Sequence, residues 1–204
     1  MPATEPLVHV VDDEPAIRES LAMLLRSVGL QSRAYGSAQE FLDSWRPGGA
    51  ECLVCDVRMP GMSGLELQEA LKARNSQVPV VLITGHGDVA MAVRAMKAGA
   101  SDFIEKPFND QVLLDAVNRA LARARDGQDD GRAEIEARIE LLTPREREVM
   151  LLVAEGRPNK VVATRLGLST RTVEVHRAKV MEKLQARSLA ELVRMAILCG
   201  LMRP

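Results

Sequence analysis

The stretch LVHVVDDEPA, residues 7–16, determines how the first part of this 204-residue chain is expected to fold. Residues 7–11 have the composition of a buried β-strand, and Asp12, Asp13 and Glu14 follow at once. Carboxylates this close repel one another and are costly to bury unless a cation or another donor balances them. Pro15 suits the first turn of a helix, so the acids are expected in a turn between a strand and a helix.

Strands and helices continue to alternate along the chain. Four more strands are expected, over residues 31–35, 52–56, 78–84 and 102–105. A helix is expected after each of the five strands, over residues 15–29, 37–45, 65–74, 89–99 and 109–125. Continuous apolar strands that alternate with amphipathic helices indicate a parallel sheet covered on both faces. Ligands of such sheets bind beyond the carboxyl ends of the strands.

Polar side chains of matching chemistry follow four of these strands: Asp12 with Asp13, Asp56, Thr84 and Lys106. Asp12 and Asp13 are predicted to hold a hard cation, Mg²⁺ or Mn²⁺ in its place, and Asp56 is predicted to be a nucleophile toward phosphorus. Lys106 would pair with the transferred phosphoryl group, and Thr84 would contact its oxygens. The set therefore predicts phosphoryl transfer to Asp56.

Composition narrows the class of protein. The chain has no uncharged run of 18 residues, and its first residues lack the basic and apolar regions of a signal peptide, so a cytoplasmic protein is expected. Cys52 and Cys55 form a C-x-x-C pair, but residues three apart on a strand face opposite ways. We interpret them as small buried hydrophobic residues rather than as a redox or metal site.

Charge is distributed unevenly along the chain. Residues 143–204 carry a net charge of +6, whereas residues 1–125 carry −3 and residues 126–142 carry −4. Only the C-terminal part is therefore expected to face a polyanion. The polar stretch DGQDDG, residues 126–131, marks a boundary, and apolar residues at helical spacing after it predict a partly helical linker over residues 126–142. The sequence leaves open what that helix packs against.

Short helices separated by a tight turn characterise residues 143–204. Thr143 and Glu146 have the spacing of a capping box, Gly167 ends a second helix, and Ser169 caps a longer basic helix. Two short helices followed by a longer basic one are typical of a helix-turn-helix that binds DNA.

The longer helix carries most of the predicted DNA contacts. Glu174 can accept a hydrogen bond from cytosine, and Val175 and Ala178 can touch thymine methyl groups. Arg171 and Lys179 lie around the same side of this helix. Four other side chains are better placed for phosphates: Lys160, Arg165, Thr170 and Thr172.

Four motifs in order resemble the receiver domain of two-component response regulators: VVDDEPAIRESL, LVCDVRMPGMSGLEL, VVLITGHGD and AMKAGASDFIEKPF. The resemblance covers about residues 5–125. It implies a flavodoxin-like α/β fold with a five-stranded parallel sheet in the order 2-1-3-4-5, and phosphorylation of Asp56 by a sensor histidine kinase. It also implies Mg²⁺ held by Asp13 and Asp56, with Asp12 assisting and the backbone carbonyl of Arg58 contributing.

Further residues match the switch machinery of that family. Thr84 and Phe103 match the pair that reorients on phosphorylation, with Phe in place of the commoner Tyr. Lys106-Pro107 resembles the family's Lys-Pro pair, whose peptide bond is usually cis. His86 is interpreted as an ordinary loop residue, with an influence on the lifetime of the phosphate as the alternative.

Residues 142–184 resemble the LuxR-type DNA-binding domain of the FixJ and NarL regulators, in the motif LTPREREVMLLVAEGRPNKVVATRLGLSTRTVEVHRAKVMEKL. The resemblance implies an all-α module of four helices. Many relatives have an aliphatic residue at Arg177, which is therefore expected at the rim of the core, within reach of DNA. The segment SLAELVRMAILCG is similar to a last helix used for dimer contacts, here through Leu189, Leu192, Val193 and Ala196.

The whole chain thus resembles FixJ-like response regulators, with a receiver domain at 1–125, a linker at 126–142 and a DNA-binding domain at 143–204. The resemblance implies a transcription regulator rather than an enzyme. Its implied partners are a sensor histidine kinase, double-stranded DNA, RNA polymerase and, after phosphorylation, a second copy of the chain. A phosphatase-type enzyme and a DNA-binding protein with an unphosphorylated receiver are the alternatives. Short loops argue against the first, and the complete set of acids, hydroxyl and lysine argues against the second.

Overall fold

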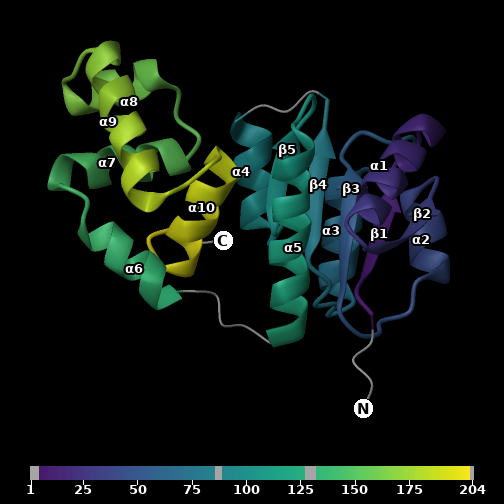
Figure 1. Ribbon diagram of the computed structural model, residues 1–204. Coiled ribbons are helices and arrows are strands. Elements are labelled where there is room, and N and C mark those ends of the chain that lie inside the picture. Colours follow the sequence, from purple (N-terminus) through teal and green to yellow (C-terminus); the bar gives the residue numbers. More distant parts are fainter. Residues whose placement is uncertain (1–4, 86–88, 127–131, 203–204) are drawn as a thin grey trace. The chain divides into compact units, whose positions relative to one another are not determined.

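The computed structural model describes residues 5–85, 89–126 and 132–202 (Figure 1). The chain divides into two compact units, residues 1–87 with 98–129 and residues 88–97 with 130–204. Strands lie in the first unit, and the described part of the second unit is helical. Of the helices in the described ranges, none combines the length and the apolarity that crossing a membrane requires.

Parallel strands form the sheet of the first unit, in the spatial order β2-β1-β3-β4-β5. The strands are β1 (Leu7–Val11), β2 (Gln31–Tyr35), β3 (Glu51–Asp56), β4 (Val80–Thr84) and β5 (Asp102–Glu105). In register, Val10 of β1 lies beside Ala34 of β2 and Val54 of β3. The predicted strand order and the parallel arrangement are therefore confirmed.

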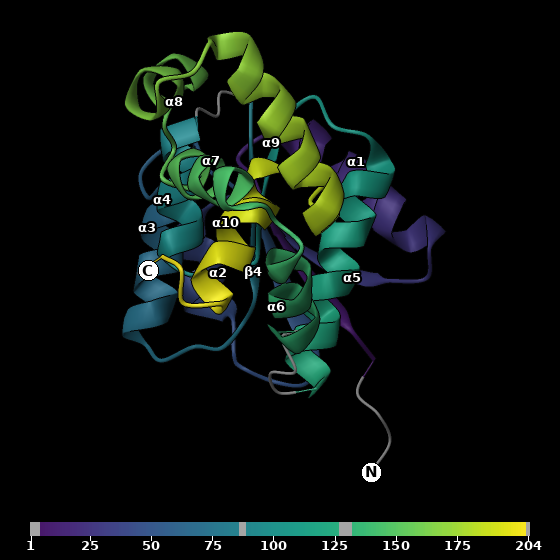
Figure 2. The same cartoon turned by 90° about the vertical axis from the view of Figure 1, so that its left-hand side faces the viewer.

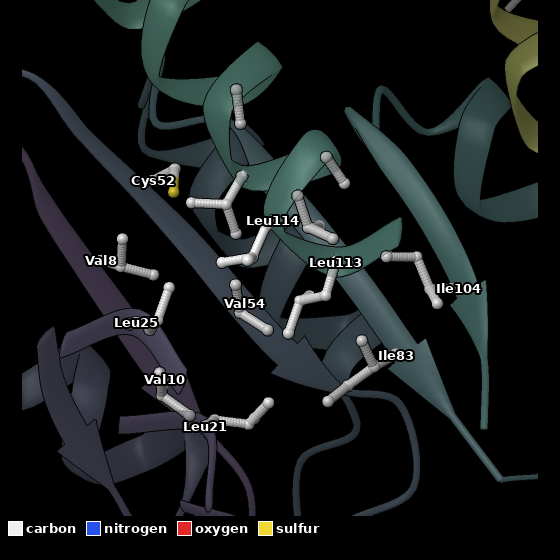
Figure 3. Close-up of a cluster of buried hydrophobic side chains, with 14 of the residues drawn as sticks. Val8, Val10, Leu21, Leu25, Cys52, Val54, Ile83, Ile104, Leu113 and Leu114 are labelled. Atoms are coloured by element: carbon white, nitrogen blue, oxygen red, sulfur yellow. The ribbon is translucent and has the colours of Figure 1, made fainter. Parts of the chain in front are cut away.

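Helices α1 (Pro15–Ser27) and α5 (Asp110–Asp126) pack on one face of this sheet. Figure 3 shows Leu21 and Leu25 of α1 and Leu113 of α5 pointing toward Val10 and Val54 of the strands. Each fully buried aliphatic side chain of this kind stabilises the fold by about 1.5–3 kcal/mol. A core built from many such residues holds the strand ends in fixed positions.

Three further helices follow β2, β3 and β4 in the chain. They are α2 (Ala38–Ser44), α3 (Gly64–Ala73) and α4 (Val89–Lys97). Phe41 of α2 packs edge-on against His9, which alternates along β1 with the core residues Val8 and Val10. Helix α2 therefore covers the other face of the sheet at β1. The peptide bond between Lys106 and Pro107 is cis, as the family resemblance implied.

Besides α4, the second unit contains α6 (Arg132–Glu140), α7 (Pro144–Ala154), α8 (Asn159–Leu166), α9 (Thr170–Leu184) and α10 (Leu189–Leu198). Helix α9 packs against α7 and α8 (Figure 2), and its residues Val173, Val180 and Leu184 are buried. The predicted capping box is present, because Thr143 Oγ1 accepts from Glu146 N at 3.2 Å and Thr143 N donates to Glu146 Oε2 at 2.8 Å.

The linker helix predicted from the sequence is α6, and it packs on α9. Ile135 and Ile139 of α6 are buried, and Arg138 Nη1 donates to the carbonyl oxygen of Leu184 at 3.3 Å. A second hydrogen bond runs from α9 to the end of α6, because Lys183 Nζ donates to the carbonyl oxygen of Leu141 at 3.1 Å. The structure thus answers the question that the sequence left open, while residues 127–131 lie outside the described ranges.

Candidate functional site

Lys106 Nζ lies between two carboxylates at the carboxyl edge of the sheet. It donates to Asp56 Oδ1 at 2.7 Å and to Asp12 Oδ2 at 3.1 Å. Asp12 directly follows β1, Asp56 ends β3, and Lys106 directly follows β5. Asp12 is 1% exposed and Asp56 is 6% exposed. Three of the predicted strand-end residues are therefore in direct contact.

The charges in this cluster are unequal. Burial by itself lowers the pKa of the Lys106 ammonium, but its hydrogen bonds to Asp56 and Asp12, together with their negative charges, outweigh burial and raise that pKa above its ordinary value. Lys106 is therefore cationic at neutral pH. Two carboxylates facing one ammonium leave an excess of negative charge, to which the exposed Asp13 adds. Such an excess favours a further cation.

Main-chain groups fix the direction of both buried acids. Asp12 Oδ1 accepts from Glu14 N at 2.9 Å, and Asp56 Oδ2 accepts from Arg58 N at 2.6 Å. Strand β1 ends at Val11, so Asp12 and Asp13 both lie in the turn before α1. Each buried carboxylate consequently has one oxygen bound to the backbone and the other bound to Lys106.

Thr84 and Phe103, the predicted switch pair, are both buried. Thr84 is fully buried at the end of β4, and Phe103 is 8% exposed in the neighbouring β5. Lys106 N donates to the carbonyl oxygen of Thr84 at 2.7 Å, which links the end of β4 to the acid cluster. His86 lies outside the described residues.

Small residues surround the backbone of Asp56. Gly64 begins α3, and a Cβ atom there would overlap the carbonyl oxygen of Asp56 and approach Cys55 Sγ to 3.1 Å. Cys55 Sγ donates to that same carbonyl oxygen at 3.2 Å. Any side chain at position 64 would therefore displace the strand end that carries Asp56.

The burial expected for the two strand cysteines is confirmed. Cys52 and Cys55 are unlinked to each other and fully buried in β3. Burial, with a smaller contribution from the charge of Glu51, raises the pKa of Cys52 to about 12, so the thiol stays protonated. Within the described ranges, no group of three or more His, Cys, Asp and Glu side chains is close enough to hold a metal ion.

Most of the predicted DNA-contacting side chains are exposed. The exposed residues are Lys160, Arg165, Thr170, Arg171, Glu174, Val175, Ala178 and Lys179, and Thr172 is half-buried. Arg177 is also half-buried, at the rim of the core, and its Nη1 donates to Asn159 Oδ1 at 3.3 Å. Leu192, Val193 and Ala196 of α10 are fully buried, and Leu189 is half-buried.

Two protein families match separate parts of the chain. Residues 8–118 match the response regulator receiver domain, and residues 140–196 match the bacterial regulatory proteins of the luxR family. The chain is a response regulator. Its receiver implies a sensor kinase as partner, and its luxR-type domain implies DNA binding, so this response regulator is a two-component transcription regulator.

The response regulator is 52% identical over 202 residues to the transcriptional regulatory protein FixJ of Azorhizobium caulinodans, covering 98% of this chain and 95% of the relative. The crystal structure of full-length FixJ from B. japonicum is 44% identical, with a TM-score of 0.56 over 97% of this chain and 98% of that one. The structure of the response regulator StyR is 46% identical, with a TM-score of 0.57 over 95% and 98%. The relatives are named as transcriptional regulators, not as enzymes.

One residue beside the acids was missed by the sequence analysis. Arg18 of α1 donates from Nη1 to the carbonyl oxygen of Asp12 at 2.6 Å. A signal for it exists in the sequence, because helical side chains lean toward the helix N-terminus, and Arg18 is four residues after Glu14. A long cationic side chain one turn after an acidic turn can therefore fold back onto that turn.

Proposed function

We propose that Asp56 is the phosphoacceptor of this response regulator and that a sensor histidine kinase supplies the phosphoryl group. A carboxylate oxygen of Asp56 attacks phosphorus, the bond from phosphorus to the imidazole nitrogen of the kinase breaks, and an acyl phosphate forms. The observation that carries the proposal is the pair of hydrogen bonds from Lys106 Nζ to Asp56 and Asp12. Lys106 would stabilise negative charge that develops on the phosphoryl oxygens.

Mg²⁺ is the proposed cofactor, with Mn²⁺ as a substitute. Carboxylate and carbonyl oxygens are the ligands that Mg²⁺ prefers, and Asp12, Asp13, Asp56 and the carbonyl group of Arg58 provide such oxygens around a site with excess negative charge. The cation would neutralise charge on the transferred group. The residue types present therefore suit the metal that the family implies. Since the described Asp and Glu side chains do not gather into a group of three, binding of the ion would draw these carboxylates closer together.

Thr84 and Phe103 are proposed to convert phosphorylation into a change of surface. The hydroxyl group of Thr84 would bind a phosphoryl oxygen, and Phe103 would repack in response. Support comes from the hydrogen bond between Lys106 N and the carbonyl oxygen of Thr84, and from the adjacency of β4 and β5. Phosphorylation would thereby change the equilibrium between two arrangements of this region.

DNA binding is proposed to use the exposed face of α9, with Glu174, Val175 and Ala178 at base edges. Arg171 and Lys179 would lie on the same face, and Arg177 would reach DNA from the rim of the core. Four other side chains would contact phosphates: Lys160, Arg165, Thr170 and Thr172. Phosphorylation would promote pairing of two copies of the chain through α10. The DNA-bound protein would recruit RNA polymerase. It would act in the cytoplasm. Because Leu192, Val193 and Ala196 are buried, pairing through them requires a change in the packing around α10.

Replacement of Asp56 tests the proposal. Asp56→Asn keeps the shape of the side chain but removes the nucleophilic carboxylate, so acetyl phosphate should no longer phosphorylate the chain. Phosphorylation-dependent dimerisation and DNA binding should disappear with it. The measurements are a phosphate-affinity gel, light scattering and fluorescence anisotropy with labelled DNA.

Asp43→Asn is the matched control, because Asp43 is an exposed acid of the same unit whose side chain contacts Gln39. It should be phosphorylated like the wild type. Full phosphorylation of Asp56→Asn, or persistence of phosphodonor-stimulated DNA binding in it, would show that Asp56 is not the phosphoacceptor.

A further inference from the structure

We propose that Arg18 is a positioning residue for the cation-binding acids, because it holds the peptide unit that joins Asp12 to Asp13. The proposal rests on the proposed function of this site. Arg18 Nη1 donates to the carbonyl oxygen of Asp12 at 2.6 Å. That oxygen belongs to the planar peptide unit between the two acids, so fixing it fixes the direction in which the chain enters Asp13.

The other polar groups of Asp12 have partners of their own. Asp12 N donates to the carbonyl oxygen of Tyr35 at 3.3 Å, Oδ1 accepts from Glu14 N at 2.9 Å, and Oδ2 accepts from Lys106 Nζ at 3.1 Å. Arg18 supplies the partner of the remaining group, the carbonyl. Asp12 is consequently held through its amide, its carboxylate and its carbonyl, each by a different part of the chain.

Asp13 depends most on this contact. Its side chain is exposed and makes no hydrogen bond within the described residues. The direction of its carboxylate therefore follows from the main chain at positions 12 and 13. If Arg18 releases the Asp12 carbonyl, the peptide unit can rotate, and the direction of Asp13 relative to Asp12 is no longer fixed. A metal site loses affinity when groups that orient its ligands are removed.

The surroundings of Arg18 explain why an arginine suits this position. Arg18 N donates to the carbonyl oxygen of Glu14 at 3.2 Å, so the residue is anchored in the first turn of α1. Beyond it lies Gly36, where a Cβ atom would be 3.8 Å from Arg18 Nη1 and 3.9 Å from Cζ. The guanidinium is thus close to both the turn after β1 and the turn after β2. Its permanent charge also offsets the repulsion among Asp12, Asp13 and Glu14.

Calorimetric titration of the full chain with MgCl₂ tests the proposal. Arg18→Ala should raise the Kd for Mg²⁺ by about 10-fold, the smaller end of the loss seen when groups that orient metal ligands are removed. Arg18→Lys keeps the charge without the planar fork and should show a smaller rise. The phosphorylation rate with acetyl phosphate should need more Mg²⁺ in Arg18→Ala but reach a similar maximum at saturation.

Arg26→Ala is the matched control, because Arg26 is an exposed arginine in the last turn of the same helix. It should bind Mg²⁺ like the wild type. A wild-type Kd in Arg18→Ala, or an equal loss in Arg26→Ala, overturns the role of Arg18. A merely structural role would lower the melting temperature without Mg²⁺ and leave the Kd unchanged, which also overturns it.

A second variant tests the proposal in case Arg18→Ala does not fold. Arg18→Met keeps most of the length of the side chain but removes the hydrogen-bond donor to the Asp12 carbonyl, and should raise the Kd for Mg²⁺ in the same direction. An unchanged Kd there overturns the proposal. If the wild type itself binds no Mg²⁺, the cofactor assignment fails and the role of Arg18 fails with it. If the wild type binds Mg²⁺ and is phosphorylated, while the variants show the wild-type Kd, only the role of Arg18 is overturned.

Discussion

Glu146 is a buried acid whose charge stabilises the DNA-binding unit. It is 3% exposed, and its Oε2 accepts from Lys183 Nζ at 2.7 Å and from Thr143 N at 2.8 Å. The hydrogen bond from Lys183, followed by that from the backbone of Thr143, lowers the pKa of Glu146 to about 2. One carboxylate thus joins the start of α7 to α9 and, through Lys183, to the end of the linker helix.

Loss of this charge should destabilise the fold in a pH-dependent way. Glu146→Gln should lower the free energy of unfolding at pH 7 by about 1.5–3 kcal/mol, the usual contribution of a hydrogen bond to a charged group. Because the folded pKa lies below the ordinary value of 4.5, this contribution is complete above pH 4.5 and is lost as the pH falls toward 2. Urea unfolding of both chains between pH 7 and pH 3 measures it.

The exposed Glu148, which pairs with Arg145 at 2.7 Å, provides the control for this experiment. Glu148→Gln should change the free energy of unfolding by less than about 1 kcal/mol at any of these pH values. A gap between the wild type and Glu146→Gln that stays constant from pH 4.5 to pH 3 would contradict the role given to the Glu146 charge.

Single residues also show how far the sequence predicts the site. The common location of Asp12, Asp56, Thr84 and Lys106 could be predicted because parallel strands bring their carboxyl ends to one edge of the sheet, whatever the details of packing. The buried contacts of His9 with Glu51 at 2.9 Å and with Tyr35 at 3.0 Å could not be predicted. They join residues 42 and 26 positions apart, and only the strand order and side-chain packing bring them together.

At the scale of elements, the turn between α8 and α9 depends on one glycine. Gly167 has φ +64° and ends α8, and Leu168 N donates to the carbonyl oxygen of Ala163 at 2.9 Å. A Cβ atom at position 167 would meet nothing within 4 Å, so crowding plays no part there. The left-handed backbone conformation alone favours glycine.

Replacement of Gly167 should therefore cost stability through backbone strain. Gly167→Ala should lower the free energy of unfolding by about 1–2 kcal/mol, the usual cost of this conformation for a residue with a Cβ atom. Asn tolerates the same conformation better, so Gly167→Asn should recover part of the loss. Thermal unfolding of the three chains measures the effect, and equal stability of Gly167→Ala and the wild type would contradict it.

Elements also differ in how well the sequence predicted them. The strands and the helix-turn-helix were predicted to within a few residues, because hydrophobic periodicity and capping residues such as Thr143 and Ser169 are local signals. The packing of α6 was left open, because Ile135 and Ile139 form an apolar face that suits several neighbours. In the structure α6 packs on α9, and hydrogen bonds to carbonyl groups at the ends of these two helices accompany that packing. Such hydrogen bonds have no local pattern in the sequence.

At the scale of the whole molecule, the concentration of positive charge in residues 143–204 predicts how DNA binding responds to salt. Lys160 is exposed on α8 and is expected at a phosphate. Lys160→Gln should weaken binding to specific and nonspecific DNA alike. It should also reduce the slope of log Kd against log salt concentration by about one, as loss of one phosphate contact does. Anisotropy titrations at several salt concentrations measure the slope.

Glu174→Gln provides the contrasting variant, because we propose that Glu174 contacts a base edge. It should change the preference among DNA sequences at one position and should not reduce the salt slope. An unchanged slope in Lys160→Gln would remove that residue from the phosphate contacts.

The outermost strands of the sheet limit how copies of this chain can associate. Strand β2 has five residues with the exposed Arg33 at its centre, and β5 has four and ends in the exposed Glu105. Short strands with a charged side chain are poor templates for pairing between molecules. The sheet edges are thus poorly suited to amyloid-like pairing between molecules.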